Sequence, residues 1–348
     1  MPGWVQREHT SAEIDAAGRT LIGRPVTLSE WSAAIDVINN WRSAHAFPLN
    51  TLQMGLRTRA QQIERQAVIA QRIKRRVAIA DKLGRMPDLV LSAMQDIGGC
   101  RAVLSSVESA RALAVLCRTP RRPSRHLLLR ENNYVDNPKS DGYRSIHFVY
   151  EYRSERNETY NGLKIEVQIR SHLQHVWATA VETVDAFEGQ GIKSGRGERD
   201  WRRFFALMGD VIARKEDCPR VPNMPVSSES VRRELARYVD RLQVEARLGA
   251  YRLATKRITR RGLRGWGYFV LELRPREHSM VIRRYKGSLD GAESAAEQYF
   301  ATETQNERDP TRDVVLVKVS SLEALRSAYP NYFSDTREFL ALVLEAVG

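Results

Sequence analysis

Two acidic residues far apart in the sequence, Asp96 and Glu166, stand in settings that suit a metal-bound nucleotide. Asp96 is followed by Ile97, Gly98 and Gly99, and glycines let a backbone approach a phosphate closely where the chain enters a strand. Mg²⁺ usually takes one or two protein carboxylates beside the phosphates of its substrate. We therefore expect Asp96 and Glu166 to bind Mg²⁺ together, although an ordinary turn would account for the same Asp-Ile-Gly-Gly sequence.

The residues around Glu166 alternate between apolar and polar, as in a β-strand. Because side chains on a strand point alternately to its two faces, Glu166, Gln168 and Arg170 should share one face. The same rule places Tyr143 and His147 on one side of an earlier strand, where the tyrosine ring could stack on a base. A carboxylate, an amide and a guanidinium thus lie in one row. The alternative interpretation is the solvated face of a half-exposed sheet.

Basic side chains accompany these groups. Arginine makes bidentate contacts with phosphate, whereas lysine supplies a compact charge. The cations expected to neutralise a triphosphate are Arg72, Lys74, Lys82, Arg101 and Lys139. Across the chain, 55 Lys and Arg residues against 42 Asp and Glu residues give a formal net charge of +13. This excess favours a polyanionic substrate or partner, which could be a nucleotide, RNA, DNA or an acidic protein.

Length and composition limit the class of protein. A chain of 348 residues is about twice the usual domain length, which predicts two domains. No apolar run approaches the length of a membrane span, and Glu8, Glu13 and Asp15 lie where a signal peptide would be apolar. The three cysteines form no CxxC pair that would indicate a zinc site or a disulfide framework. We expect a cytoplasmic protein without a membrane partner.

Helical and strand periods alternate along the first part of the chain. Apolar spacing predicts helices at residues 29–46, 49–83, 107–117 and 172–187. Alternation predicts strands at residues 100–104, 125–130, 143–152 and 163–170. The turn at Asn161-Gly162 indicates that the last two strands form a hairpin, which would bring their polar faces together.

A proline-rich segment divides the chain. Pro219, Pro222 and Pro225 cannot continue a helix, and we place an interdomain linker at residues 218–228. The first domain then covers residues 1–217 and the second covers residues 229–348. The second is predicted to be a small C-terminal α+β domain, with helices at 231–253 and 292–300, strands at 266–273, 279–285 and 314–319, and two short terminal helices.

Taken in order, the segments of the first domain resemble the synthetase domain of the RelA/SpoT family, over residues 49–187. The matching pieces are Arg72-x-Lys74, Lys82-Leu83, Asp96-Ile-Gly-Gly-Cys-Arg101, Tyr134, Pro138-Lys139-x-x-Gly142-Tyr143-Arg144-Ser145-Ile146-His147, Ile165-Glu166-Val-Gln168-Ile-Arg170, His175, Trp177-Ala178 and Glu182. This resemblance implies an α+β fold with a mixed β-sheet flanked by helices, related to nucleotidyltransferases.

The family moves the β,γ-pyrophosphate of ATP onto a ribose 3′-hydroxyl and releases AMP. Carried over by position, the resemblance implies that Asp96 and Glu166 are catalytic and bind Mg²⁺, or that Glu166 activates the attacking hydroxyl. The residues implied to bind ATP are Arg72, Lys74, Lys82 and Arg101. Those implied to bind the acceptor are Lys139, Tyr143, Arg144, His147, Gln168 and Arg170, with Tyr143 stacked on its base.

The sequence departs from the family pattern in two places. Ala78 stands where many members have Ser, and Glu182-Thr183 stands where many have Glu-His, which leaves the acceptor geometry open. Members that also hydrolyse the product carry a metal-binding His-Asp pair in a separate domain. None of the seven histidines here is followed by Asp, so we predict no hydrolase activity.

The usual family acceptor is GDP or GTP, which yields (p)ppGpp. The segment Asn39-Asn-Trp41-Arg42-Ser-Ala-His45-x-x-Pro48-Leu49 resembles instead the N-terminal helix pair of toxic small alarmone synthetases. That subgroup pyrophosphorylates the 3′-CCA end of tRNA, which blocks translation, and basic clusters would then contact tRNA phosphates without reading sequence. We favour tRNA as the acceptor and keep (p)ppGpp synthesis as the alternative. The alternative interpretation of Trp41 is that it packs in a helical core, with the basic residues scattered.

The second domain, with its terminal stretch at residues 329–339, resembles the fused antitoxin part of CapRel-type proteins, single-chain toxin–antitoxins of phage defence. That part resembles a zinc finger without its metal, and no cysteine here lies beyond Cys218. The resemblance implies a regulatory domain that occludes the ATP site until a trigger, such as a phage-derived protein, binds it. A passive stability domain and a catalytically inactive RNA-binding sensor are the alternatives, and the oligomeric state stays open.

Overall fold

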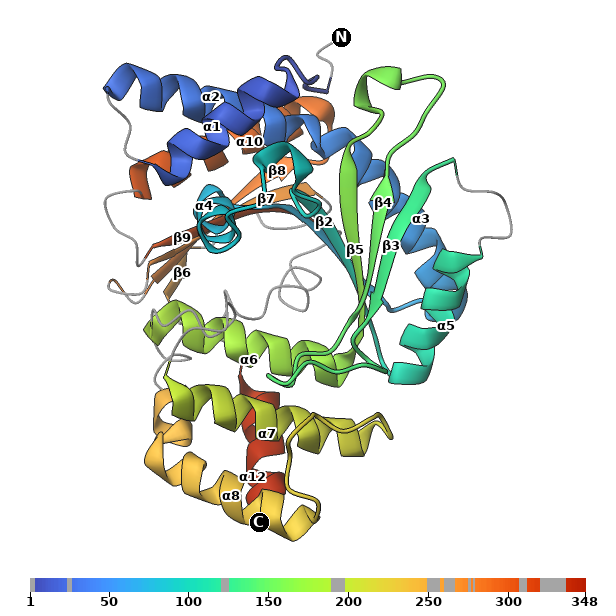
Figure 1. Cartoon of the computed structure of the whole chain (residues 1–348), viewed down its shortest axis with the longest axis vertical. Coiled ribbons are helices and arrows are strands. Elements are labelled where there is room, and N and C mark those ends of the chain that lie inside the picture. Colours follow the sequence, from blue (N-terminus) through green and yellow to red (C-terminus); the bar gives the residue numbers. More distant parts are fainter. Residues whose placement is uncertain are drawn as a thin grey trace.

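One mixed β-sheet runs through the protein (Figure 1). The computed structural model describes residues 4–23, 27–119, 125–188, 198–248, 257–259, 267–274, 277, 279–306, 312–319 and 336–348. Within these ranges the strand order is β3-β4-β5-β2-β1-β9-β7-β8-β6, with β2 parallel to β5 and β6 parallel to β8. The strands are β1 (Val68–Ile73), β2 (Gly98–Leu104), β3 (Leu127–Asn133), β4 (Ile146–Glu151), β5 (Lys164–Ser171), β6 (Arg257–Thr259), β7 (Gly267–Arg274), β8 (Ser279–Lys286) and β9 (Asp313–Val319). The predicted α+β fold with a mixed sheet is confirmed.

The sheet continues across the predicted linker. Strand β1 pairs antiparallel with β9, with Gln71 opposite Lys318 and Arg72 opposite Val317. Strands β7 and β8 then extend the same sheet beyond β9. The division into domains at residues 218–228 stays a prediction, and the two parts that it separates share one sheet.

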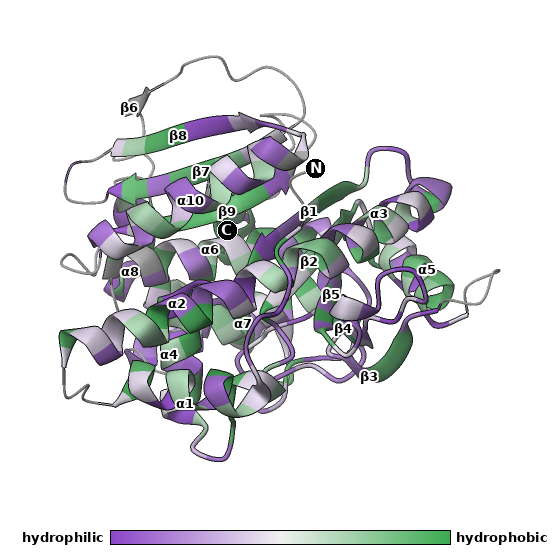
Figure 2. Cartoon of the chain, turned by 90° about the horizontal axis from the view of Figure 1, so that it is seen from above, coloured by the Kyte–Doolittle hydropathy of each residue, from purple (hydrophilic) through white to green (hydrophobic). Residues whose placement is uncertain are grey.

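Three helices cover one face of this sheet. Helices α3 (Ala46–Ile63) and α5 (Val107–Arg118) lie over β1, β2 and β5, and α10 (Leu289–Gln305) lies over β7, β8 and β9. Figure 2 shows apolar residues along β7 and β9 beneath α10, where Val270 and Tyr299 are fully buried. On β2 and β5 the apolar residues Cys100 and Val167 take this face, which leaves Glu166 and Gln168 for the opposite one. On β7 the opposite face also carries buried apolar residues, Phe269 and Leu271.

A second core consists of helices only, and in Figure 1 it lies below the sheet with α6 nearest to it. Phe204 and Phe205 contact Phe339 from the C-terminal end of the chain, with ring centroids 6.1 and 5.8 Å apart. The last helix therefore packs on the first part of the protein. Its helices include α6 (His172–Glu188), α7 (Arg199–Lys215), α8 (Ser228–Arg241) and α12 (Arg337–Val347), and the helical residues 244–248 add the buried side chains of Val244 and Leu248.

A third core packs the N-terminal helices around Ile38, Trp41 and Ile79, all of which are buried. Thr10 and Thr27 begin the first two helices with capping boxes, in which each threonine and a glutamate three residues later satisfy each other's backbone N–H groups. The helices are α1 (Ser11–Ile22), α2 (Leu28–Ala44) and α4 (Arg76–Arg85), with short 3₁₀ turns at η1 (Leu91–Ala93) and η2 (Glu158–Tyr160).

The helix predicted at residues 49–83 is wrong. Helix α3 ends at Ile63, and β1 and then α4 follow. Ile69 and Ile73 are four residues apart, a spacing that fits one face of a helix and one face of a strand equally well. Pairing with β2 and β9 at the centre of the sheet decides in favour of the strand.

The other predicted elements of the first part are confirmed, including the antiparallel pair β4 and β5. In the second part the strands and the helix at 292–300 are also present, although the helix predicted at 231–253 ends at Arg241 as α8. One terminal helix is α12, while most of the stretch at 329–339 lies outside the described residues. Among the described helices none combines the length and the hydropathy needed to cross a membrane.

Candidate active site

The face of the sheet opposite α3 and α5 gathers the predicted site residues in two neighbouring rows. Arg72 on β1 lies opposite Gly99 on β2, and Gly99 lies opposite Glu166 on β5. Gln168 on β5 lies between Arg101 and His147 in the second row. Because directly opposed residues share a face, four strands present these side chains to the same side.

The two glycines of β2 have different surroundings. Among the described residues, a Cβ atom on Gly99 would meet only the Glu166 carbonyl oxygen, 3.9 Å away, so none of them fills the space above Gly99. A Cβ atom on Gly98 would lie 2.7 Å from Cδ1 of Ile165, on the side that faces α3. Gly99 therefore leaves a gap between Arg72 and Glu166, whereas Gly98 allows close packing in the core.

The first acidic group of the site is Asp96, which lies just before β2. Lys74 and Lys82 each donate to one of its carboxylate oxygens over 2.9 Å. Burial alone would raise the pKa of Asp96, but the two lysines outweigh it and lower this pKa to about 2. Burial is the larger effect on Lys74, whose pKa falls to about 8 despite the nearby carboxylate. Asp96 is thus ionised at neutral pH and has more than one cation beside it.

The second acidic group, Glu166, accepts hydrogen bonds through both oxygens. The ring Nδ1 of His147 is 3.0 Å from Oε1, and Nε2 of Gln168 donates to Oε2 over 2.7 Å. Burial works against ionisation, yet His147 and Gln168 keep the pKa of Glu166 below its ordinary value. Arg170 donates to Oε1 of Gln168 over 2.8 Å and so fixes the orientation of that amide.

An aromatic group adjoins Glu166. The Tyr143 hydroxyl is 2.8 Å from Nε2 of His147, which makes a chain from the phenol through the imidazole to the carboxylate. Nζ of Lys139 lies 4.5 Å from the ring centroid of Tyr134 and 5.3 Å from that of Tyr143. Tyr134 also meets the His147 ring edge-on at 5.3 Å, although we assigned it no role from the sequence. Its position between a predicted strand and the Lys139 loop was the available signal.

Arg144 does not join this group. It is 2 % exposed and donates to the backbone carbonyls of Val135 and Pro219. These bonds fasten the start of the proline-rich segment to the loop after β3. The other predicted residues lie on the strands of that face, on the Lys139 loop, at the ends of β1 and β2, or, for Lys82, on α4. The acceptor role predicted for Arg144 finds no support in its contacts.

The donor set fits a magnesium ion shared with substrate phosphates. Within the described part of the chain, no group of three or more His, Cys, Asp or Glu side chains could hold a metal by itself. Asp96 and Glu166 are both ionised, are 20 % and 19 % exposed, and affect each other's charge, since Asp96 opposes the ionisation of Glu166. Two carboxylates are the usual protein contribution to a magnesium–nucleotide site.

Comparison with known proteins identifies the segment that carries these residues. Residues 71–186 match the family model described as the region found in RelA / SpoT proteins. ATP pyrophosphokinase activity is typical of synthetases of that family. No curated protein matches the chain.

Solved structures of small synthetases are similar to about half of the chain. Small alarmone synthetase 1 from Bacillus subtilis, solved bound to its product pppGpp, is 18% identical, with 51% of this chain and 93% of that chain covered and a TM-score of 0.42. A GTP pyrophosphokinase family protein from Streptococcus pneumoniae is 21% identical, with 55% and 91% covered and a TM-score of 0.41.

Proposed function

Because residues 71–186 are a RelA/SpoT region, we propose that this protein is a pyrophosphokinase that transfers the β,γ-pyrophosphate of ATP to a ribose 3′-hydroxyl. The observation that carries the proposal is the arrangement of two ionised carboxylates, Asp96 and Glu166, around the open space above Gly99. Cations flank one carboxylate, and a histidine and an amide flank the other.

The Asp96 side of the site suits ATP. Lys74 and Lys82 already hold an anion there, and Arg72 and Arg101 point to the same face from β1 and β2. A triphosphate would exchange with or join the Asp96 carboxylate as the partner of these cations. Mg²⁺, when bound by Asp96 and Glu166, would neutralise phosphate charge.

The Glu166 side suits the acceptor hydroxyl. The ionised Glu166 can accept the proton as the acceptor oxygen forms its bond to the β-phosphorus and the bond between that phosphorus and the α-phosphate oxygen breaks, which releases AMP. His147 and Gln168 hold the carboxylate in place, and Tyr143 and Arg170 hold them in turn. Since the low pKa makes Glu166 a weak base, positioning supplies much of the rate.

For the acceptor we propose the 3′-CCA end of tRNA. The net charge of +13 supports a large polyanion, as does the resemblance of residues 39–49 to the toxic synthetases. Synthesis of (p)ppGpp from GTP or GDP is the second candidate, favoured by the pppGpp product named for the Bacillus subtilis structure. A catalytically inactive RNA-binding sensor is the third candidate. Such a sensor would not need two ionised carboxylates, Asp96 and Glu166, on either side of the space above Gly99.

We further propose that residues 229–348 regulate this activity as the antitoxin part of a CapRel-type phage-defence protein, with a phage-derived protein as trigger. Support comes from the pairing of β9 with β1, because β1 carries Arg72 and leads to Lys74. A change in the C-terminal part would therefore reach the ATP side of the site directly.

One competition experiment tests the activity and the acceptor together. The full-length protein is incubated with γ-labelled ATP, Mg²⁺, tRNA and GDP, with and without a candidate trigger. The proposal predicts label on tRNA, none on tRNA whose 3′-terminal ribose has been oxidised with periodate, and none with Glu166→Gln. Label on GDP would favour the second candidate, and no transfer to either acceptor would favour the third.

A further inference from the structure

Arg42 of α2 is a fully buried cation in the segment 39–49, which resembles the N-terminal helix pair of toxic small alarmone synthetases. Its Nε donates to the backbone carbonyl of Lys74 over 3.0 Å, and its Nη1 donates to the side chain of Asn39 over 3.1 Å. A buried guanidinium requires an anion, because the cost of removing its charge from water is otherwise not offset. No acidic residue of the N-terminal helices is bonded to Arg42 in the described structure.

The anion comes from the C-terminal part of the chain. Glu303 of α10 accepts from Nη1 and Nη2 of Arg42 over 2.7 and 3.3 Å, and Tyr299 accepts from Nη2 over 2.6 Å. The Glu303 side chain is 5 % exposed. Burial opposes both charges, yet each partner keeps the other ionised, so that the pKa of Glu303 is lowered and that of Arg42 is raised. We call Arg42, Tyr299 and Glu303 the α10 latch.

Glu303 also supplies what helix α4 lacks. The residue that begins α4, Arg75, makes no side-chain capping bond, and the first turn contains no acidic residue. The first backbone N–H groups of a helix need acceptors and favour a negative charge nearby. Oε1 of Glu303 accepts from the backbone N–H of Arg76 over 2.8 Å. A carboxylate 227 residues further along the chain thus caps this helix.

The segment attached to the latch carries both lysines that hold Asp96. Lys74 is tied to it through the carbonyl that accepts from Arg42, and Lys82 lies on α4, which Glu303 caps. We propose that Glu303 and Arg42 are positioning residues that set Lys74 and Lys82 for ATP, so that α10 completes the ATP side of the site. This inference rests on the proposed function of the two lysines.

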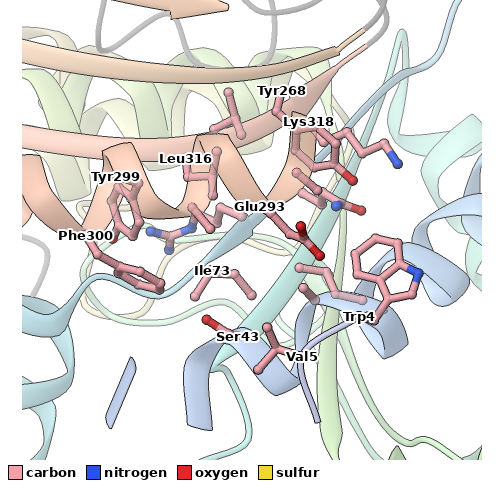
Figure 3. Close-up of a pocket in the computed structure, with 17 residues that line it drawn as sticks. Trp4, Val5, Ser43, Ile73, Tyr268, Glu293, Tyr299, Phe300, Leu316 and Lys318 are labelled. Carbon is pink, nitrogen blue, oxygen red and sulfur yellow. The ribbon is translucent and has the colours of Figure 1, made fainter. Parts of the chain in front are cut away.

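A cavity lies beside the α10 latch, between α10 and the N-terminal part of the chain. Figure 3 shows a cavity between α10, β1, β9 and the N-terminal segment, with Tyr299, Ile73 and Trp4 at its wall. Its volume is about 80 Å³. This space is large enough to hold water, so α10 is not closely packed along this wall. The Arg42–Glu303 ion pair is a direct bond that holds α10 to the N-terminal helices beside it.

Full-length Glu303→Ala and Val270→Ala variants test the proposal. Val270 is fully buried under α10 and is not among the latch residues, so V270A is a matched destabilised control. Two quantities are measured below the melting transition: the affinity for a non-hydrolysable ATP analogue with Mg²⁺, and hydrogen exchange of the backbone amides of residues 76–85. For E303A we expect affinity about tenfold weaker and faster exchange in α4, and for V270A a lower Tm with neither change.

The Glu303→Gln variant covers the case in which E303A does not fold. It keeps an acceptor for the Arg76 N–H but loses the charge, so we expect affinity about fivefold weaker. Wild-type affinity and wild-type α4 exchange in the folded variant would overturn the proposal. So would equal losses in V270A, because the effect would then be general destabilisation. A wild-type protein that does not bind the analogue either with or without the candidate trigger would refute the proposed function instead, while the exchange data would still test the cap.

Discussion

Adjacent glycines on β2 give opposite predictions when each is changed to alanine. Gly99→Ala adds a methyl group to open space, and removal of glycine from a strand is expected to stabilise the protein by about 0.5–1 kcal/mol. Gly98→Ala places a methyl group 2.7 Å from Cδ1 of Ile165, a fully buried side chain that must shift. Overpacking of this kind costs about 1–3 kcal/mol. Because Gly98→Ala gains the same backbone contribution, the two variants should differ by the overpacking cost alone, about 1–3 kcal/mol in free energy of unfolding.

The variant that is more stable, G99A, should be the one that binds ATP less tightly. The Gly99 methyl group would occupy the gap between Arg72 and Glu166 that we assign to the nucleotide, so ATP affinity should fall about tenfold, whereas folded G98A should bind ATP normally. Thermal melting and calorimetric titration with a non-hydrolysable ATP analogue measure both quantities. Lower stability of G99A than of G98A would refute the packing argument. Unchanged ATP affinity in G99A, and also in the larger Gly99→Val, would refute the location of the nucleotide.

Three further changes test individual residues. Because the pKa of Lys74 is lowered to about 8, its charge is lost as the pH rises through that value. ATP affinity should decline above about pH 8, and Lys74→Arg should remove this decline in a titration series, while an unchanged decline would exclude Lys74 as its source. Glu166→Gln should reduce turnover by about 10²–10⁴-fold, with a smaller loss of ATP affinity because a magnesium ligand is also removed, and nearly normal turnover would contradict its role. Arg144→Met leaves two carbonyls without their donor. It should lower stability by about 1–3 kcal/mol in denaturant unfolding with ATP affinity unchanged, and weaker ATP binding at normal stability would show that Arg144 serves the site.

Local patterns were sufficient for the Glu166 side of the site. Alternation along residues 163–170 fixes which residues share a face with Glu166, and the turn at Asn161-Gly162 fixes the neighbouring strand. The same alternation argues against the role given to Arg144 by resemblance, since Tyr143 and His147 were assigned to one side and Arg144 lies between them in sequence. The structure agrees with the alternation, because the Arg144 side chain is buried among backbone carbonyls.

Contacts between distant segments were not available from the sequence. Ile69 and Ile73 satisfy both periods, and only the pairing of β1 with β2 and β9 distinguishes a strand from a helix there. The continuation of the sheet from β1 to β9 likewise has no local signal. Glu303 looks like one more polar residue of a helix, and its role depends on an arginine 261 positions away. The lack of a capping side chain at Arg75 is informative only once α4 is known to begin at Arg76, which the sequence did not predict.

The central claim is that Asp96 and Glu166 together support pyrophosphoryl transfer from ATP. The most direct measurement incubates the full-length protein with ATP, Mg²⁺ and a labelled acceptor, and follows the adenine nucleotides and the acceptor in the same reaction. We predict that AMP and pyrophosphorylated acceptor appear in equal amounts. Asp96→Asn and Glu166→Gln should each suppress both products. Formation of ADP in place of AMP, or full activity in either variant, would contradict the claim.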